Sequence, residues 1–171
     1  MVLAELLDQE GNFGRKILNI NYDTYAEGEA ELGWLNSTVK LIATTPFDLS
    51  ETLLNILEQI GGRLETQGAE IAHIKAIANA NGKHDVIASI TQSGSKPELS
   101  QATVHKTSSA CITFNARVVI DPEILSHIIE TGLDDECKKR GIKYQITAIQ
   151  HLRPGRPVPT HRYSKERTQL E

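Results

Sequence analysis

Hydrophobic and polar residues alternate along several stretches of the chain, as they do in strands that bury one face. Between positions 34 and 43 apolar residues stand at Leu35, Val39 and Leu41, and polar residues lie between them. The clearest alternation covers 108–120, where apolar residues at even positions alternate with polar ones. Further strands are predicted at 71–78, 86–91 and 142–148.

Two other segments repeat their apolar residues at the spacing of an amphipathic helix. The first stripe lies between 49 and 64. Asp48 is the predicted N-cap of this helix, and Thr45, followed by a proline, is a competing start. Gly68 is expected to end the helix in a left-handed conformation.

The second helix is predicted to open at Asp121, which a proline follows at the first helical position, and to stop at Gly141. Basic residues just before Gly141 match the negative end of the helix dipole. The apolar stripe includes Cys137, so this thiol is expected in the core. The acidic run 134–136 is expected on the solvated surface of the helix.

The predicted order is strand, helix, a set of strands, helix and strand. Two helices with one apolar stripe each can cover only one face of such a sheet. We therefore predict an α+β fold, a two-layer ferredoxin-like sandwich whose mostly antiparallel sheet has about five strands and both helices on one face. Residues 32–152 form this predicted domain, 1–31 a peripheral N-terminal arm and 153–171 an extended C-terminal tail.

The sheet face without helices is expected to carry small neutral hydrogen-bonding side chains more than long charged ones. These predicted positions are Asn36, Thr38, Lys40, Ser109, Cys111, Thr113, Asn115, Arg117, Gln145 and Thr147. One interpretation is that the face meets only water, as any one-sided sheet can. The other is that it binds a partner, with Trp34, Asn36, Thr113, Asn115 and Arg117 as candidate binding residues.

The tail is rich in proline and arginine, although the protein as a whole is acidic. Prolines stiffen the segment 151–163, which presents Arg153, Arg156, His161 and Arg162 in a fixed order. Arginine forks can bind phosphate or carboxylate, so an anion site is one interpretation. The other is a strap that clamps the sheet edge or docks on a partner.

Composition narrows the choice of partners. The chain has 171 residues, of which 39% are hydrophobic and 23% charged, and its formal net charge is -4, which argues against nucleic acid as the main partner. No run approaches the ~18 apolar residues that a membrane span needs. Cys111 and Cys137 are too few for a disulfide framework, and the N-terminus lacks the basic region of a secretory signal, so a cytoplasmic location is expected.

No catalytic or metal-binding constellation is recognised. The Gly82-Lys83 pair is followed by His84, where a phosphate-binding P-loop requires Ser or Thr. His105 and Cys111 share strand parity but would stand about 20 Å apart, too far to share a metal. A nucleophilic Cys111 has no identifiable histidine partner, and a structural thiol is the better interpretation. The sequence thus predicts no catalytic residue, no metal and no cofactor.

Two segments together resemble a known family. Residues 25–36, YAEGEAELGWLN, and 153–162, RPGRPVPTHR, are similar to the C-terminal region of some CobW-like GTPases, a family linked to cobalamin synthesis and metal-cofactor delivery. The family's nucleotide-binding domain and cysteine-rich metal motif are absent from this sequence. The resemblance therefore implies a stand-alone accessory module that pairs with a GTPase made separately. Together with the open face and the strap, it predicts a non-enzymatic interaction module whose partner is a second copy of the chain, a CobW-like GTPase, or both.

A small-molecule or anion-binding protein that uses the arginine and histidine residues of the tail is the alternative function. RNA binding on the open face is disfavoured, because Trp34 is the lone candidate for stacking a base.

Overall fold

The computed structural model describes residue 28 and residues 30–80 and 84–155. Its elements run from the N-terminus in the order β1 (Gly33–Asp48), α3 (Leu49–Thr66), β2 (Glu70–Asn79), β3 (His84–Ile90), β4 (Glu98–Gln101), β5 (Lys106–Val119), α4 (Pro122–Arg140) and β6 (Lys143–Leu152). The sequence also predicts an added edge strand at 16–20 and a hairpin turn at Asn81-Gly82, and both segments lie outside the described residues.

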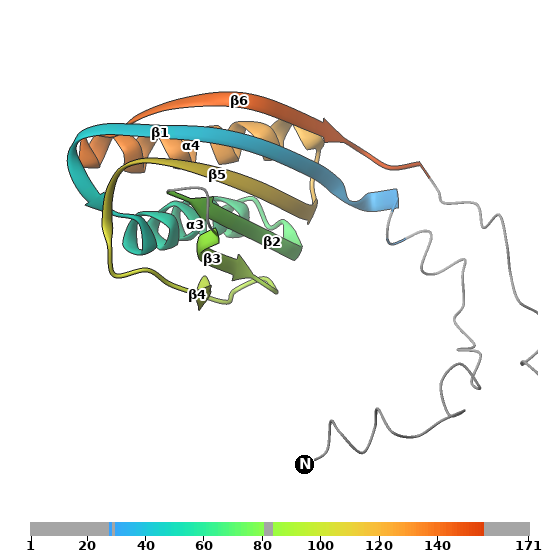
Figure 1. The fold of residues 1–171 in the computed structure, drawn as a ribbon. Helices are drawn as coiled ribbons and strands as arrows, with labels where there is room; N and C mark the ends of the chain where they lie inside the picture. Colours follow the sequence, from blue (N-terminus) through green and yellow to red (C-terminus); the bar gives the residue numbers. More distant parts are fainter. Residues whose placement is uncertain (1–27, 29, 81–83, 156–171) are drawn as a thin grey trace, which may run out of the picture.

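Within the described residues the strands form one six-stranded sheet in the order β4-β3-β2-β5-β1-β6, and every neighbouring pair is antiparallel. Both helices lie on one side of it (Figure 1). Strands β6, β1, β5 and β2 have the ferredoxin-like order, and the β3–β4 pair extends the sheet beyond β2. The predicted two-layer α+β sandwich is confirmed, but its sheet has six strands and not five.

The additional strand is β4. Its sequence, ELSQ, has one apolar residue and no alternation, so periodicity could not reveal it. It pairs with β3 at the edge of the sheet, where Leu99 lies opposite Ala88. Because an edge strand needs only one hydrogen-bonded neighbour, four residues suffice to form it.

The core lies between the sheet and the two helices. Its largest fully buried side chains include Phe114 on β5, Leu35 and Leu41 on β1, and Ile56 and Ile60 on α3. These side chains occupy the alternating positions of the strands and the apolar stripe of the helix. The one-sided packing that the hydrophobic pattern predicts is therefore present in the fold.

Both helices begin and end with the predicted residues. The Asp48 carboxylate accepts a hydrogen bond from the backbone N–H of Glu51 at 2.9 Å, and Asp121 caps α4 in the same way. Gly68 has φ +66° and Gly141 has φ +67°, the left-handed region that favours glycine. Thr45, the competing start, lies within β1, which continues to Asp48.

A bulge changes the orientation of β6. The pairing of β1 with β6 shifts between Thr38 and Val39, so Ile146 lies opposite Val39 but Ala148 lies opposite Thr38. Alternation alone predicts that Ile146 and Ala148 both face inward. The bulge instead brings Ala148 to the open face, where it is exposed.

The acidic run on α4 is not wholly on the surface. Asp134 and Asp135 are accessible, but Glu136 is only 1% exposed. Its carboxylate accepts hydrogen bonds from Arg140 and from the Asn55 amide, the latter at 3.1 Å. The expectation that this side chain solvates the helix was therefore wrong, because α3 packs over it.

The two helices approach closely at Gly132, where a Cβ atom would lie 2.8 Å from Cγ1 of Ile60. We expect Gly132→Val to lower the free energy of unfolding by about 1–3 kcal/mol through overpacking. Gly62 on α3 is the matched control, because a Cβ atom at this position would have nothing within 4 Å. Gly62→Val should change stability by less than about 0.5 kcal/mol in urea denaturation. Equal effects would show that the helices do not meet at Gly132.

Candidate functional site

The open face of the sheet is built from rows of side chains that cross β1, β5 and β2. The strand registers place each β5 residue directly between partners on the other two strands. The rows are Trp34–Arg117–His73, Asn36–Asn115–Lys75, Thr38–Thr113–Ile77 and Lys40–Cys111–Asn79. Residues opposite each other in neighbouring strands have Cβ atoms about 4.5–5.5 Å apart, so each row forms a continuous surface.

The five candidate binding residues predicted on the sheet lie together on this face. Asn36 and Thr113 are exposed, whereas Trp34, Asn115 and Arg117 are half-buried. The Asn115 amide donates a hydrogen bond to Oδ1 of Asn36 at 2.5 Å, which joins the two central strands. The polar row at the centre of the sheet is accessible and not sealed in the interior.

Trp34 and Arg117 form a stacked pair at one end of the face. The guanidinium carbon of Arg117 lies 4.2 Å from the centre of the Trp34 ring. Such a cation–π contact attracts the guanidinium to the face of the indole ring. Among the described residues, the buried Nε1 of Trp34 has no hydrogen-bond partner.

Every charged side chain at the centre of the open face is basic. The strand segments 34–42, 73–79, 109–117 and 143–152 contain no aspartate or glutamate. The basic residues that register places on this face are Lys40, Lys75, Arg117 and Lys143. The acidic residues of the strands lie near strand ends: Asp48 is the last residue of β1, Glu70 and Glu98 are the first residues of β2 and β4, and Asp85 is the second residue of β3.

The helix layer carries the opposite charge. Its acidic residues are Glu51, Glu58 and Glu65 on α3 and Glu123, Glu130, Asp134, Asp135 and Glu136 on α4. The basic residues of α4 are tied to some of these acids, as in the pairs of Lys138 with Asp134 and of Arg140 with Glu51. The two layers thus separate charge, although the whole chain is mildly acidic.

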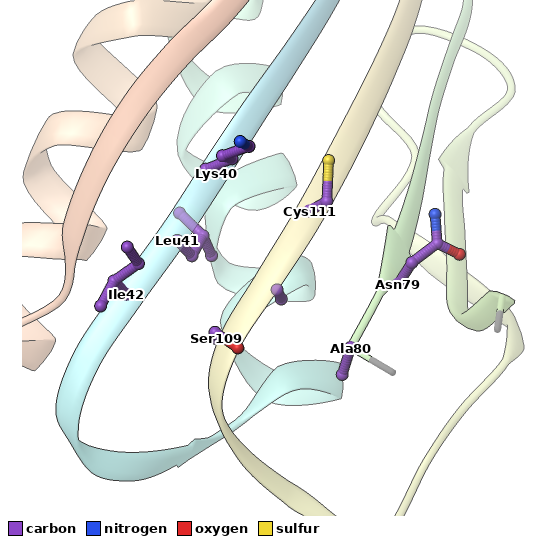
Figure 2. Close-up of a pocket in the computed structure, with 8 residues that line it drawn as sticks. Lys40, Leu41, Ile42, Asn79, Ala80, Ser109 and Cys111 are labelled. Atoms are coloured by element: carbon purple, nitrogen blue, oxygen red, sulfur yellow. The ribbon is translucent and has the colours of Figure 1, made fainter. Parts of the chain in front are cut away.

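A shallow hollow of about 370 Å³ lies on the open face at the end of β1, β5 and β2 (Figure 2). Lys40, Cys111 and Asn79 project from the three strands on the same side of the sheet. Ser109 and the apolar Ile42, which lie opposite each other on β5 and β1, complete the part of the rim that reaches the open face. The full set of lining residues is Lys40, Leu41, Ile42, Asn79, Ala80, Ser109, Ala110 and Cys111.

The sequence did not identify Asn79 or Lys75 as part of this face. The register of β2 against β5 shifts between Ile71 and His73, so Ile71 and Ile74 both face the helices. This three-residue spacing of buried isoleucines is the signal that could have located the bulge and the residues after it.

The tail is only partly described. Arg153 is exposed, and its guanidinium donates a long hydrogen bond of 3.5 Å to the carbonyl of Ile120. Arg156, His161 and Arg162 lie outside the described residues. The predicted anion site and the predicted strap both depend on these residues, so both stay predictions.

Within the described ranges no group of three or more histidine, cysteine, aspartate or glutamate side chains is placed to hold a metal ion. No helix in the described part of the chain has the length and apolar character to cross a membrane.

The sequence matches no protein-family model and no curated protein. Among solved structures, a hydantoinase/carbamoylase family amidase from Burkholderia ambifaria is similar at 13% identity with a TM-score of 0.42. The alignment covers 71% of this chain and 27% of the amidase chain, so this protein spans about a quarter of the amidase's length. A likeness at this level carries no argument about function.

Proposed function

We propose that this protein is a non-enzymatic interaction module whose open sheet face binds an acidic surface of another protein. The observation that carries the proposal is the charge of the face, where Lys40, Lys75, Arg117 and Lys143 stand without a carboxylate among them. Complementary charge across an interface steers association and selects the partner.

Self-association through the same face is the less favourable version of this proposal. A two-fold dimer would place the basic face of one copy against the basic face of the other. Like charges brought together in an interface oppose binding. We therefore expect the protein alone to be a monomer in sedimentation equilibrium.

A nucleic acid would also match the charge but lacks the stacking surfaces that single strands use. Trp34 is the one aromatic side chain that the described registers place on this face, and Arg117 covers one side of its ring. Phe114 and Tyr144 point toward the helices. Protein carboxylates are thus the better match for the basic groups.

The face is tested by titrating the ¹⁵N-labelled protein with poly-L-glutamate and following the backbone amide resonances. We expect shifts confined to β1, β2, β5 and β6, and weaker binding as salt screens the charges. Lys75→Glu should weaken binding by roughly tenfold or more, because it reverses a charge within the face.

Lys96→Glu is the matched control, because it changes the net charge equally and lies beside α3, away from the face. It should leave affinity nearly unchanged. An equal loss in both variants, or shifts spread over the helices, would contradict the proposal. Stronger binding of polyuridylate than of poly-L-glutamate would assign the face to nucleic acid instead.

The resemblance to CobW-like GTPases supplies the first natural partner to examine. A purified CobW-like GTPase of the same organism should co-sediment with the wild-type protein and with Lys96→Glu, but not with Lys75→Glu. We propose the cytoplasm as the compartment, which is supported by the free thiols of Cys111 and Cys137.

A further inference from the structure

We propose that the hollow beside Lys40 is a binding site for a carboxylate carried on a short apolar stem. The inference deepens the proposed function. It rests on that function if the carboxylate belongs to a protein, but it does not if the carboxylate belongs to a free small acid. The site is distinct from the residues that the sequence pattern singled out for binding.

The polar groups of the hollow favour an anionic ligand. Lys40 and Cys111 lie directly opposite each other on β1 and β5, and Asn79 lies directly opposite Cys111 on β2. Neighbouring strands are about 4.8 Å apart, so the three side chains span about 10 Å. The ammonium group has three hydrogen-bond donors, and the Asn79 amide and the Ser109 hydroxyl can add more.

These groups are not committed to other contacts. In the described part of the chain Lys40 forms no ion pair, and the side chains of Ser109 and Cys111 form no hydrogen bond. No lining residue is acidic. A carboxylate could therefore pair with Lys40 in a charge-assisted hydrogen bond.

The shape of the hollow limits the rest of the ligand. Its volume of about 370 Å³ is at the small end of ligand sites. Ile42, which is 61% exposed, stands two residues after Lys40 on β1 and provides an apolar flank on the same face. A stem of a few carbon atoms attached to the carboxylate would cover Ile42 and remove its apolar surface from water.

Cys111 provides a direct readout, because a ligand in the hollow covers its thiol. We would alkylate the whole protein with iodoacetamide, add butyrate or its neutral isostere butyramide at equal ionic strength, and follow the modification by intact mass. At a ligand concentration about ten times its dissociation constant, butyrate should slow alkylation of Cys111 roughly tenfold. Butyramide should have little effect.

Cys137 is the internal reference in every sample. It is only 1% exposed, and burial raises the pKa of its thiol to about 11, so it should stay unmodified while the protein is folded. Lys40→Gln should abolish the protection by butyrate. Lys75→Gln removes a charge from the same face but outside the hollow, and it should retain the protection.

A second arm distinguishes the source of the carboxylate. The capped peptide Ala-Ala-Glu-Ala-Ala is compared with its Gln analogue in the same assay. Protection by the Glu peptide alone assigns the hollow to a protein side chain, and protection by butyrate alone assigns it to a free small acid. Equal protection by the charged and neutral ligands of both pairs, or none at all, would overturn the inference.

The two proposals can fail separately. If butyrate gives no protection but poly-L-glutamate still binds, the carboxylate site in the hollow is wrong and the proposed binding of an acidic partner by the open face is supported. If butyrate protects Cys111 but poly-L-glutamate does not bind, the hollow is a carboxylate site and the open face does not bind an acidic partner.

Discussion

Replacing Phe114 with alanine is expected to lower the free energy of unfolding by about 3–5 kcal/mol. Phe114 is fully buried at the centre of β5, in the core between the sheet and the helix layer. The substitution would remove a large apolar side chain and leave a cavity that the surrounding strands and helices cannot close. Guanidinium denaturation monitored by circular dichroism measures the loss.

Thr113 is the matched control, since it is the adjacent residue on the same strand but points to the open face and is exposed. Thr113→Ala should change stability by less than about 0.5 kcal/mol. The contrast tests the one-sided packing on which the proposed interaction face depends. Equal destabilisation by the two substitutions would show that Thr113 is buried as well, and it would contradict the one-sided packing.

The second large effect is expected at Glu136, which holds the two helices together from within. Its carboxylate pairs with Arg140, whose guanidinium also reaches Glu51 on α3 at 3.0 Å. Glu136→Ala would remove the acceptor of the Asn55 amide and the buried one of the two carboxylates that pair with Arg140, at an expected cost of about 3 kcal/mol. Asp135, next in sequence, forms an exposed pair with Arg63, so Asp135→Ala should cost less than about 1 kcal/mol.

The contribution of Glu136 should also depend on pH. Burial alone would raise the pKa of its carboxyl group, but hydrogen bonds from Arg140 and Asn55 outweigh burial, and the pKa is lowered below its usual 4.5. A group whose pKa is lower in the folded state stabilises the protein at neutral pH and loses this effect as the pH falls through the folded value.

The stability difference between wild type and Glu136→Gln should therefore be largest near neutral pH and shrink below the usual pKa. Chemical denaturation at a series of acidic pH values measures it. A difference that stays constant throughout the acidic range would show that Glu136 is not ionised in the folded protein.

Local sequence rules predicted the helices and the central strands well, because each of these elements carries its own signal. Asp48 and Asp121 cap the helices as expected, and the glycines that end them have positive φ. The alternation along β5 likewise separates Phe114 in the core from Thr113 on the open face.

Features that depend on pairing between distant segments could not be predicted in this way. The position of Asn79 beside Cys111 follows from the register of two strands and from a bulge within β2. The burial of Glu136 requires α3 to pack over it. Strand β4 forms because its backbone pairs with the edge of β3. In each case the deciding contact is made by residues far apart in the sequence.

The stacked pair at the end of the open face has a practical consequence. Trp34 is the chain's only tryptophan, and Arg117 lies against its ring. The intrinsic fluorescence of the untagged protein therefore comes mainly from an indole on the surface proposed to bind. A molecule that covers this indole or displaces the guanidinium should alter its emission, which provides an optical signal for docking that needs no attached dye.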